Sequence, residues 1–230
     1  GAVVLDAGTG AVTLRIDGAS PVERAVFLPG GRRLVVARRD GTLEVVEVGT
    51  GDARVVAGAT GRGGECDALD VSHGGRFVVE SRRALAPRVR IVDLETGTTS
   101  FLAAPDDWIW LGITSDAAAR RVAGAAADGA ILCADRDGDA VFRTVAEHDH
   151  VPLGVAFDPA GDRVLSWGED RRAIVADLVL GTRQELFLHQ QGVTSAAWSP
   201  DGRQIATWSS ERILRLFDAA DGRPVRAIQA

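Results

Sequence analysis

Aspartate and histidine clusters are the first places to look for chemistry in this sequence. Residues 135–139 (DRDGD) alternate carboxylates as a calcium-binding loop does, but no glutamate follows at the distance at which such a loop needs its last ligand. His148 and His150 stand on either side of Asp149 and carry the donor atoms of a metal site. We interpret DRDGD as a tight hairpin turn and assign His148 a structural role below, so we predict no metal site.

The other motifs with catalytic potential are incomplete. The glycine-rich segment 58–64 (GATGRGG) lacks the Lys-Ser/Thr pair and the helix that complete a phosphate-binding loop. Cys66 and Cys133 stand far apart, without the spacing of a metal site, and are expected to be buried reduced thiols. No GxSxG, HExxH or Cys/His arrangement occurs in the sequence. We therefore predict no catalytic residue and no cofactor.

Length, composition and charge exclude several classes of partner. The chain has 230 residues, 46% of them hydrophobic, which allows one large domain or two small ones with enough apolar material for a core. Its 26 basic residues are all arginines spread among 32 acidic residues, and the net charge is −6, so no basic face for nucleic acid is expected. No apolar run approaches the ~20 residues of a membrane helix, and no signal pattern is present. We predict a cytoplasmic chain that binds neither nucleic acid nor membrane.

One unit of sequence recurs along the whole chain. Six segments share an apolar run, an acidic residue and a glycine-containing turn. Their acidic residues lie 41, 46, 42, 42 and 41 positions apart, at Asp6, Glu47, Asp93, Asp135, Asp177 and Asp218. Each complete unit holds four short apolar runs separated by Gly, Asp and Pro, which is typical of antiparallel strands joined by hairpins. A four-stranded sheet with two apolar faces buries both when such sheets pack radially, so the repeat predicts an all-β propeller.

The repeat boundaries predict a single domain that begins inside a blade. Complete four-stranded blades are expected at 19–58, 59–103, 104–147, 148–188 and 189–230, after a half blade at 1–18 that supplies only third and fourth strands. A seven-bladed ring needs about 60 to 65 more residues before Gly1. We expect an upstream segment, or another chain, to complete the ring. The absence of Met fits a fragment or a processed chain, and the joint absence of Met, Tyr, Lys and Asn indicates a GC-rich, bacterial gene.

The last repeat resembles those of the WD-repeat family. It reads VTSAAWSPDG at 193–202 and ILRLFD at 213–218. The family joins a histidine, a Ser or Thr, an acidic residue and a tryptophan in one hydrogen-bonded tetrad. Carried over, the resemblance assigns these places in the last two repeats to His189, Ser209 and Glu211, with Phe217 for the tryptophan, and to His148 and Asp170. The first three complete repeats lack the histidine, so the tetrads are degenerate.

The resemblance also implies a shared face for most of the tryptophans. In the family's topology, the loops before the first strand of a blade and after its second strand meet on one face, the top face. The side chains expected there are Trp108, Trp110, Trp167, Trp208, Asp106, Asp107, Asp149, His150, Gln190 and Gln191. Tryptophan is enriched at binding hot spots, and an acidic rim favours a basic partner. The alternative is that the rings fill the space between blades.

These features predict a non-enzymatic interaction, sensor or scaffold module whose partner is a protein or a peptide with a basic segment. The resemblance places it as the C-terminal propeller of a larger bacterial signalling or defence protein. An enzyme is one alternative, because residues 151–161 (VPLGVAFDPAG) also resemble repeats of lactonase-like propellers, whose sites lie in the central channel. Such a site needs polar groups pointing inward from several first strands, and these strands are mostly apolar. An excised or engineered propeller fragment is the other alternative.

Overall fold

The computed structural model describes residues 1–59, 64–83, 89–104, 109–187 and 189–229. These residues form β-strands and contain no helix. The strands make one two-stranded sheet and five four-stranded sheets, and all pairings are between consecutive, antiparallel strands. In order along the chain the six sheets are β1 (Ala2–Leu5) and β2 (Val12–Ile16); β3 (Val22–Phe27), β4 (Arg33–Arg38), β5 (Leu43–Glu47) and β6 (Ala53–Ala57); β7 (Cys66–Val71), β8 (Phe77–Arg82), β9 (Val89–Asp93) and β10 (Thr99–Leu102); β11 (Trp110–Ser115), β12 (Arg121–Ala126), β13 (Ala130–Asp135) and β14 (Arg143–Glu147); β15 (Pro152–Phe157), β16 (Arg163–Gly168), β17 (Ala173–Asp177) and β18 (Arg183–Leu186); β19 (Val193–Trp198), β20 (Gln204–Ser209), β21 (Ile213–Asp218) and β22 (Pro224–Gln229).

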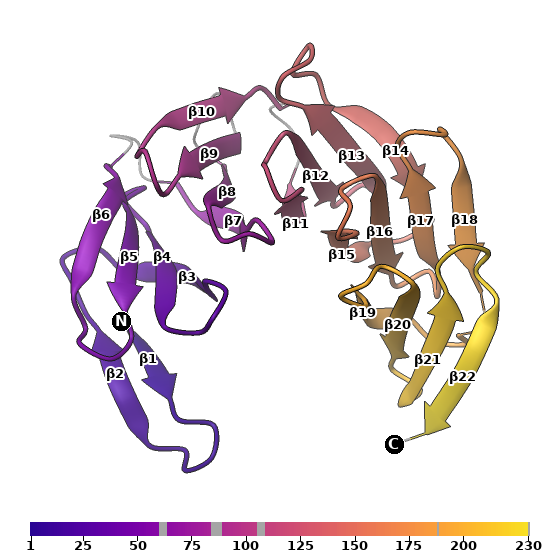
Figure 1. Cartoon of the computed structure of the whole chain (residues 1–230), viewed down its shortest axis with the longest axis horizontal. Helices are drawn as coiled ribbons and strands as arrows, with labels where there is room; N and C mark the ends of the chain where they lie inside the picture. The colour runs from indigo at the N-terminus through magenta and orange to yellow at the C-terminus, as the bar shows by residue number, and fades with distance from the viewer. Residues whose placement is uncertain (60–63, 84–88, 105–108, 188, 230) are drawn as a thin grey trace.

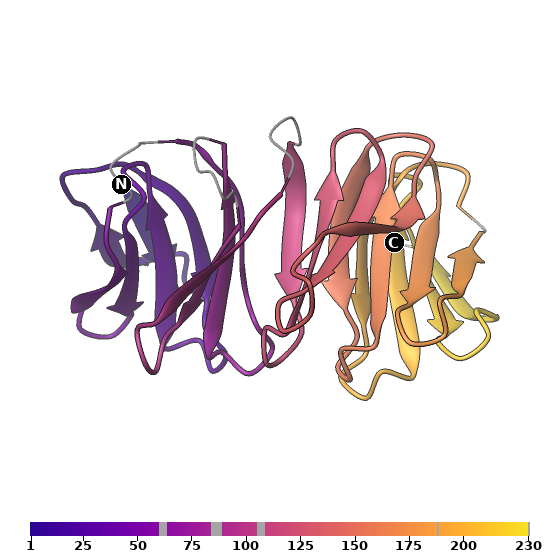
Figure 2. The same ribbon diagram turned by 90° about the horizontal axis from the view of Figure 1, so that it is seen from above.

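The six sheets stand side by side along an open arc (Figure 1). The first strand of each four-stranded sheet lies on the inner side of the arc and the fourth strand lies on the outer side (Figure 1). Neighbouring inner strands are in contact, as β7 is with β11 and β11 is with β15. Seen from the side, the strands span one common thickness, so their turns gather on two opposite faces (Figure 2). The predicted all-β propeller, with five four-stranded blades and half of another, is confirmed.

The core lies between adjacent blades, and this placement explains the apolar runs of the middle strands. Val35 and Val36 follow each other in β4, point to opposite faces of the sheet, and are both 0% exposed. Val35 belongs to the cluster shared with the next blade, which includes Val78, whereas Val36 packs with Ile16 of the half blade. A strand buried on both faces needs apolar residues at successive positions, so strict alternation is lost.

An aspartate fixes the turn between the third and fourth strands of a blade. The Asp177 carboxylate accepts hydrogen bonds from the backbone N–H groups of Val179 at 2.9 Å and Leu180 at 2.7 Å. Gly181 then adopts a φ of +67°, a left-handed conformation that glycine reaches at little cost. Asp93 and Asp218 hold their turns in the same way. The recurring acidic residue and glycine of the sequence therefore form the turns of the blades.

Both ends of the arc present sheet faces that no described blade covers (Figure 1). In the half blade, Val3 and Leu5 of β1 are 51% and 54% exposed, and β1 pairs with β2 alone. At the other end, every residue of β22 is exposed. Trp208 is half-buried and points away from the neighbouring blade, since Ile205 and Thr207 on the other face of β20 point toward it.

Candidate functional site

The hydrogen-bond network of His148 ties two loops of the top face together. Its Nδ1 atom lies 2.9 Å from both carboxylate oxygens of Asp170, and its Nε2 atom lies 2.9 Å from the Ser166 hydroxyl. Asp170 also accepts hydrogen bonds from the Asp149 backbone N–H at 3.1 Å and from the Arg172 guanidinium at 2.8 Å. Burial alone would raise the pKa of Asp170, but the hydrogen bond from His148 and the arginine lower it. The network holds the segment that leads into β15 against the turn between β16 and β17.

The equivalent network of the last blade has a different hydroxyl from the one predicted. His189 Nε2 lies 2.7 Å from the Thr207 hydroxyl, and its Nδ1 lies 2.7 Å from a Glu211 carboxylate oxygen. Ser209 does not contact the imidazole, because it lies two residues further along β20, nearer the turn. Its hydroxyl donates instead to the Glu211 carboxylate at 3.0 Å. The spacing in the sequence could have identified Thr207, because Ser166 and Thr207 each follow their histidine by 18 positions. Burial is the main cause that lowers the pKa of His189, which keeps the imidazole neutral at neutral pH.

The second complete blade, which has no such histidine, carries a buried ionic network at the same positions. Glu80 pairs with Arg90 across β8 and β9 as Thr207 pairs with Arg215 in the last blade. The Glu80 carboxylate lies 3.1 Å from Arg82 Nε and also forms an ion pair with Arg90. Arg82 further donates to the Arg38 carbonyl oxygen at 2.9 Å, which links this blade to the preceding one. The repeat pattern of the sequence does not predict this network.

The tryptophans do not form a shared binding surface among the described residues. Trp110 is 2% exposed and packs on the Phe142 ring, with a centroid distance of 5.1 Å. It therefore belongs to the core and is not the exposed top-face residue that we expected. Trp167 is half-buried, with its ring lying over Gly154, and Trp208 faces the open end of the arc. The burial alternative therefore describes Trp110. Three candidates lie outside the described residues: Asp106, Asp107 and Trp108.

The polar candidates of the top face are exposed, and they differ in whether they pair with another side chain of this chain. His150, Gln190 and Gln191 are all exposed. The Asp149 side chain is 82% exposed and forms an ion pair of 2.7 Å with Arg172. Asp149 is therefore part of the edge of the His148 network, and its charge is balanced by an arginine of this chain.

Four aliphatic side chains at the start of the inner strands were missed by the sequence analysis. Ile109 and Leu111 are 42% and 40% exposed, and Val151 and Leu153 are 38% exposed each. They flank the start of β11 and β15, adjacent inner strands, and we call them the aliphatic rim. The signal was their recurrence at one repeat's distance, with Ile109 matching Val151 and Leu111 matching Leu153.

A pocket of about 450 Å³ adjoins the aliphatic rim at Ile109 and Leu111. Its charged side chains pair among themselves, because Arg39 lies 3.1 Å from Glu23 and Arg83 lies 2.6 Å from Asp67. Aliphatic side chains have no such partner. The free energy still to be gained on this face is therefore mainly hydrophobic.

Comparison with known proteins agrees with this architecture. Residues 182–218 match the family model described as WD domain, G-beta repeat. The structure is similar to the β-propeller domain of Cps50 (Swd1) from Myceliophteria thermophila, with a TM-score of 0.71 and 17% identity over 96% of this chain and 74% of that chain. The chain has a β-propeller fold, and its residues 182–218 match a WD repeat. This propeller fold fits a protein-interaction scaffold.

Among curated proteins, none is similar enough in sequence to count as a relative. Over the ranges that the structure describes, no helix is long and apolar enough to cross a membrane. In the same ranges, His, Cys, Asp and Glu side chains form no group of three or more placed to hold a metal ion.

Proposed function

We propose that this propeller is a non-enzymatic interaction module that binds a protein or peptide at the aliphatic rim of its top face. The observation that carries the proposal is the exposure of Ile109, Leu111, Val151 and Leu153 on two adjacent inner strands. Exposed aliphatic side chains grouped beside a pocket are typical of a binding surface rather than of a solvated face. The partner has an apolar anchor residue for the rim.

A basic flank on the partner is the second part of the proposal. The net charge of the chain is −6, and the Glu65 side chain beside the rim is 63% exposed. Long-range attraction of this kind raises the association rate more than it raises affinity. We therefore assign the apolar anchor to affinity and the basic flank to the rate of encounter.

Substitution of two rim residues tests the proposed site. Peptides selected from a random library on the wild-type chain should bind Leu111→Ser/Leu153→Ser at least tenfold more weakly, since loss of two aliphatic contacts costs about 1.5–3 kcal/mol. Fluorescence anisotropy with the selected peptides measures the change. Val179→Ser/Leu180→Ser is the matched control, because these aliphatic side chains are 65% and 73% exposed in a turn on the other face. Unchanged affinity in the rim variant would overturn the proposal.

We also propose that this propeller is the C-terminal part of a larger cytoplasmic bacterial signalling or defence protein, and that an upstream segment or another chain completes its ring. Support comes from the uncovered faces at both ends of the arc and from the match to only 74% of the Cps50 propeller domain. The arginine-only basic composition supports the bacterial origin. The gene sequence before Gly1 is expected to encode two strands and one full blade, about 60 to 65 residues. An upstream sequence without this repeat would contradict completion by the same chain.

A further inference from the structure

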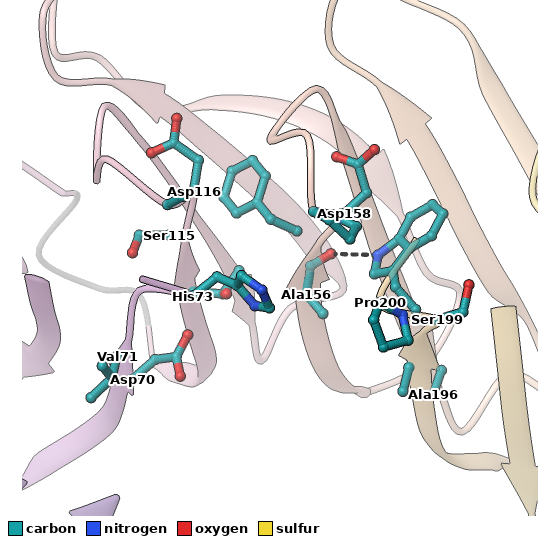
Figure 3. Close-up of a pocket in the computed structure, with 16 residues that line it drawn as sticks. Asp70, Val71, His73, Ser115, Asp116, Ala156, Asp158, Ala196, Ser199 and Pro200 are labelled. Atoms are coloured by element: carbon teal, nitrogen blue, oxygen red, sulfur yellow. Dashed lines mark hydrogen bonds between the residues drawn. The ribbon is translucent and has the colours of Figure 1, made fainter. Parts of the chain in front are cut away.

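A second pocket lies on the bottom face, opposite the aliphatic rim. It has a volume of about 310 Å³ and lies where the inner strands of four blades, β7, β11, β15 and β19, reach their turns. Asp70 and Ser115 lie on one side of the close-up view, and Ala196 and Pro200 lie on the other side, with His73 between (Figure 3). Phe157 and Trp198 also line it. None of these residues belongs to the site proposed above, so this inference does not rest on it.

The pocket includes a position where one blade has a small residue. Ser115 pairs with Val122 across β11 and β12. At the same register the other four blades carry bulky side chains, namely Phe27, Val71, Phe157 and Trp198. Serine therefore leaves a volume beside β11 that the repeat normally fills. The space is created by the sequence of this blade and is no general feature of the propeller.

Two of the three carboxylates in the pocket wall stabilise the turns to which they belong. Asp116 accepts a hydrogen bond from the Arg120 backbone N–H at 2.8 Å. Asp158 accepts from the Asp162 backbone N–H at 2.9 Å and pairs with Arg163 at 3.1 Å. These interactions account for both carboxylates as turn-forming groups.

Asp70 has no such structural role. It occupies a register at which the other blades carry Val26, Thr114, Ala156 and Ala197, so the repeat requires no carboxylate there. Its carboxyl group accepts a hydrogen bond from the Thr114 hydroxyl, and no cation pairs with it among the described residues. Burial is the main cause that raises the pKa of Asp70, because its charge loses solvation without gaining a positive neighbour.

Ser115 supplies an independent sign of a ligand. The residue is 5% exposed, and within the described residues its hydroxyl has no hydrogen-bond partner. Buried hydroxyl groups are normally paired, since an unpaired one costs about 1–3 kcal/mol. A ligand that donates to both Asp70 and Ser115 removes this cost and supplies the missing positive charge.

We propose that the bottom-face pocket binds a primary ammonium group carried on an alkyl chain. The ammonium donates to the Asp70 carboxylate and the Ser115 hydroxyl, and the alkyl chain lies against the apolar wall that includes Phe157 and Pro200. An ammonium suits this site better than a guanidinium, because Thr114 already occupies part of the Asp70 carboxylate and hinders a bidentate contact. A lysine side chain of a partner protein and a free alkylamine both have this chemistry.

Calorimetric titration of the whole chain distinguishes these sources and tests the chemistry. The probes are acetyl-lysine-methylamide with a free side-chain amine, n-butylamine, and the norleucine analogue that has no charge. We expect the lysine probe or n-butylamine to bind and the norleucine analogue to bind at least tenfold more weakly. Binding of n-butylamine alone assigns the pocket to free amines, and binding of the lysine probe assigns it to a protein side chain. Equal binding of the norleucine analogue would overturn the proposal.

Three variants locate the binding. Asp70→Asn keeps the shape and the Thr114 hydrogen bond, and is expected to weaken binding at least tenfold by removing the charge. Ser115→Val restores the volume found at this register in Val71 and is expected to abolish binding by filling the pocket. Glu169→Gln removes the same charge from an exposed top-face residue and should leave affinity unchanged. Unchanged affinity in both pocket variants, with the thermal midpoints of the wild type, would place any bound amine elsewhere and refute the assignment.

Discussion

Glu80→Gln is expected to lower the free energy of unfolding by about 3–5 kcal/mol, although the two side chains have nearly the same shape. The side chains of Glu80 and Arg82 are both 0% exposed, and that of Arg90 is 3% exposed. The variant leaves the buried Arg90 guanidinium without its carboxylate partner, and leaves Arg82 with only the Glu23 carboxylate, 3.5 Å away. An uncompensated buried charge costs more than the pair contributed, so the loss is a large part of the stability of an ordinary domain.

Urea denaturation followed by tryptophan fluorescence measures this change. The matched control is Glu47→Gln, which breaks a solvated pair with Arg33 whose side chains are 50% and 49% exposed. We expect that control to change stability by about 0–1 kcal/mol, because exposed pairs gain little over hydration. A loss below about 1 kcal/mol in Glu80→Gln would show that the two arginines find other partners or water, contrary to the buried network described.

The ionic network is one of several solutions to the same packing problem. At one register of the second strand, successive blades carry Val36, Glu80, Gly124, Ser166 and Thr207. Valine fills the space, glutamate neutralises two arginines, and the two hydroxyl residues bind a histidine. Glycine leaves the space to the Trp110 ring. The blades keep one backbone while the inter-blade contact at this position changes completely.

This variation explains what could be predicted from the sequence. The turn aspartates and glycines act within a few residues of themselves, so the periodic Asp93 and Gly97 were enough to predict the sheets and their number. Burial of Trp110 depends on the absence of a side chain at Gly124, on the neighbouring strand, and nothing in the local pattern of Trp110 shows this. The choice of Thr207 over Ser209 likewise depends on the depth of the histidine in the blade.

The aliphatic rim and the bottom-face pocket were missed for a related reason. Leu111 and Leu153 each precede a glycine in an apolar inner strand, and only their place in the assembled arc leaves them exposed. Nothing in the local sequence around Asp70 indicates a binding residue, because its lack of a cationic partner depends on the residues that three other blades place around the pocket. Repeat periodicity predicts what the blades share, whereas binding sites arise where one blade departs from the others.

Gly124→Ala is expected to destabilise the propeller by at least about 3 kcal/mol, at the upper end for overpacking in a core. A Cβ atom at this position would lie 1.7 Å from the Cζ3 atom of Trp110 and 2.0 Å from its Cε3 atom, so the ring must move. The ring has little room to do so, since Trp110 is 2% exposed and packs on Phe142. Gly49→Ala is the matched control, because no atom lies within 4 Å of its added methyl group.

A double-mutant cycle with Trp110→Leu identifies the cause of that loss. Trp110→Leu alone is expected to destabilise the chain by about 3 kcal/mol or more, because it leaves a cavity in the core. Adding Gly124→Ala to this variant is expected to cost little, because the methyl group then enters the vacated space. The two free-energy losses should therefore fall short of additivity by at least about 2 kcal/mol in urea denaturation. Additive losses would mean that the alanine acts through the backbone of β12, and that the packing of Trp110 on Gly124 does not determine how β11 and β12 of this blade fit together.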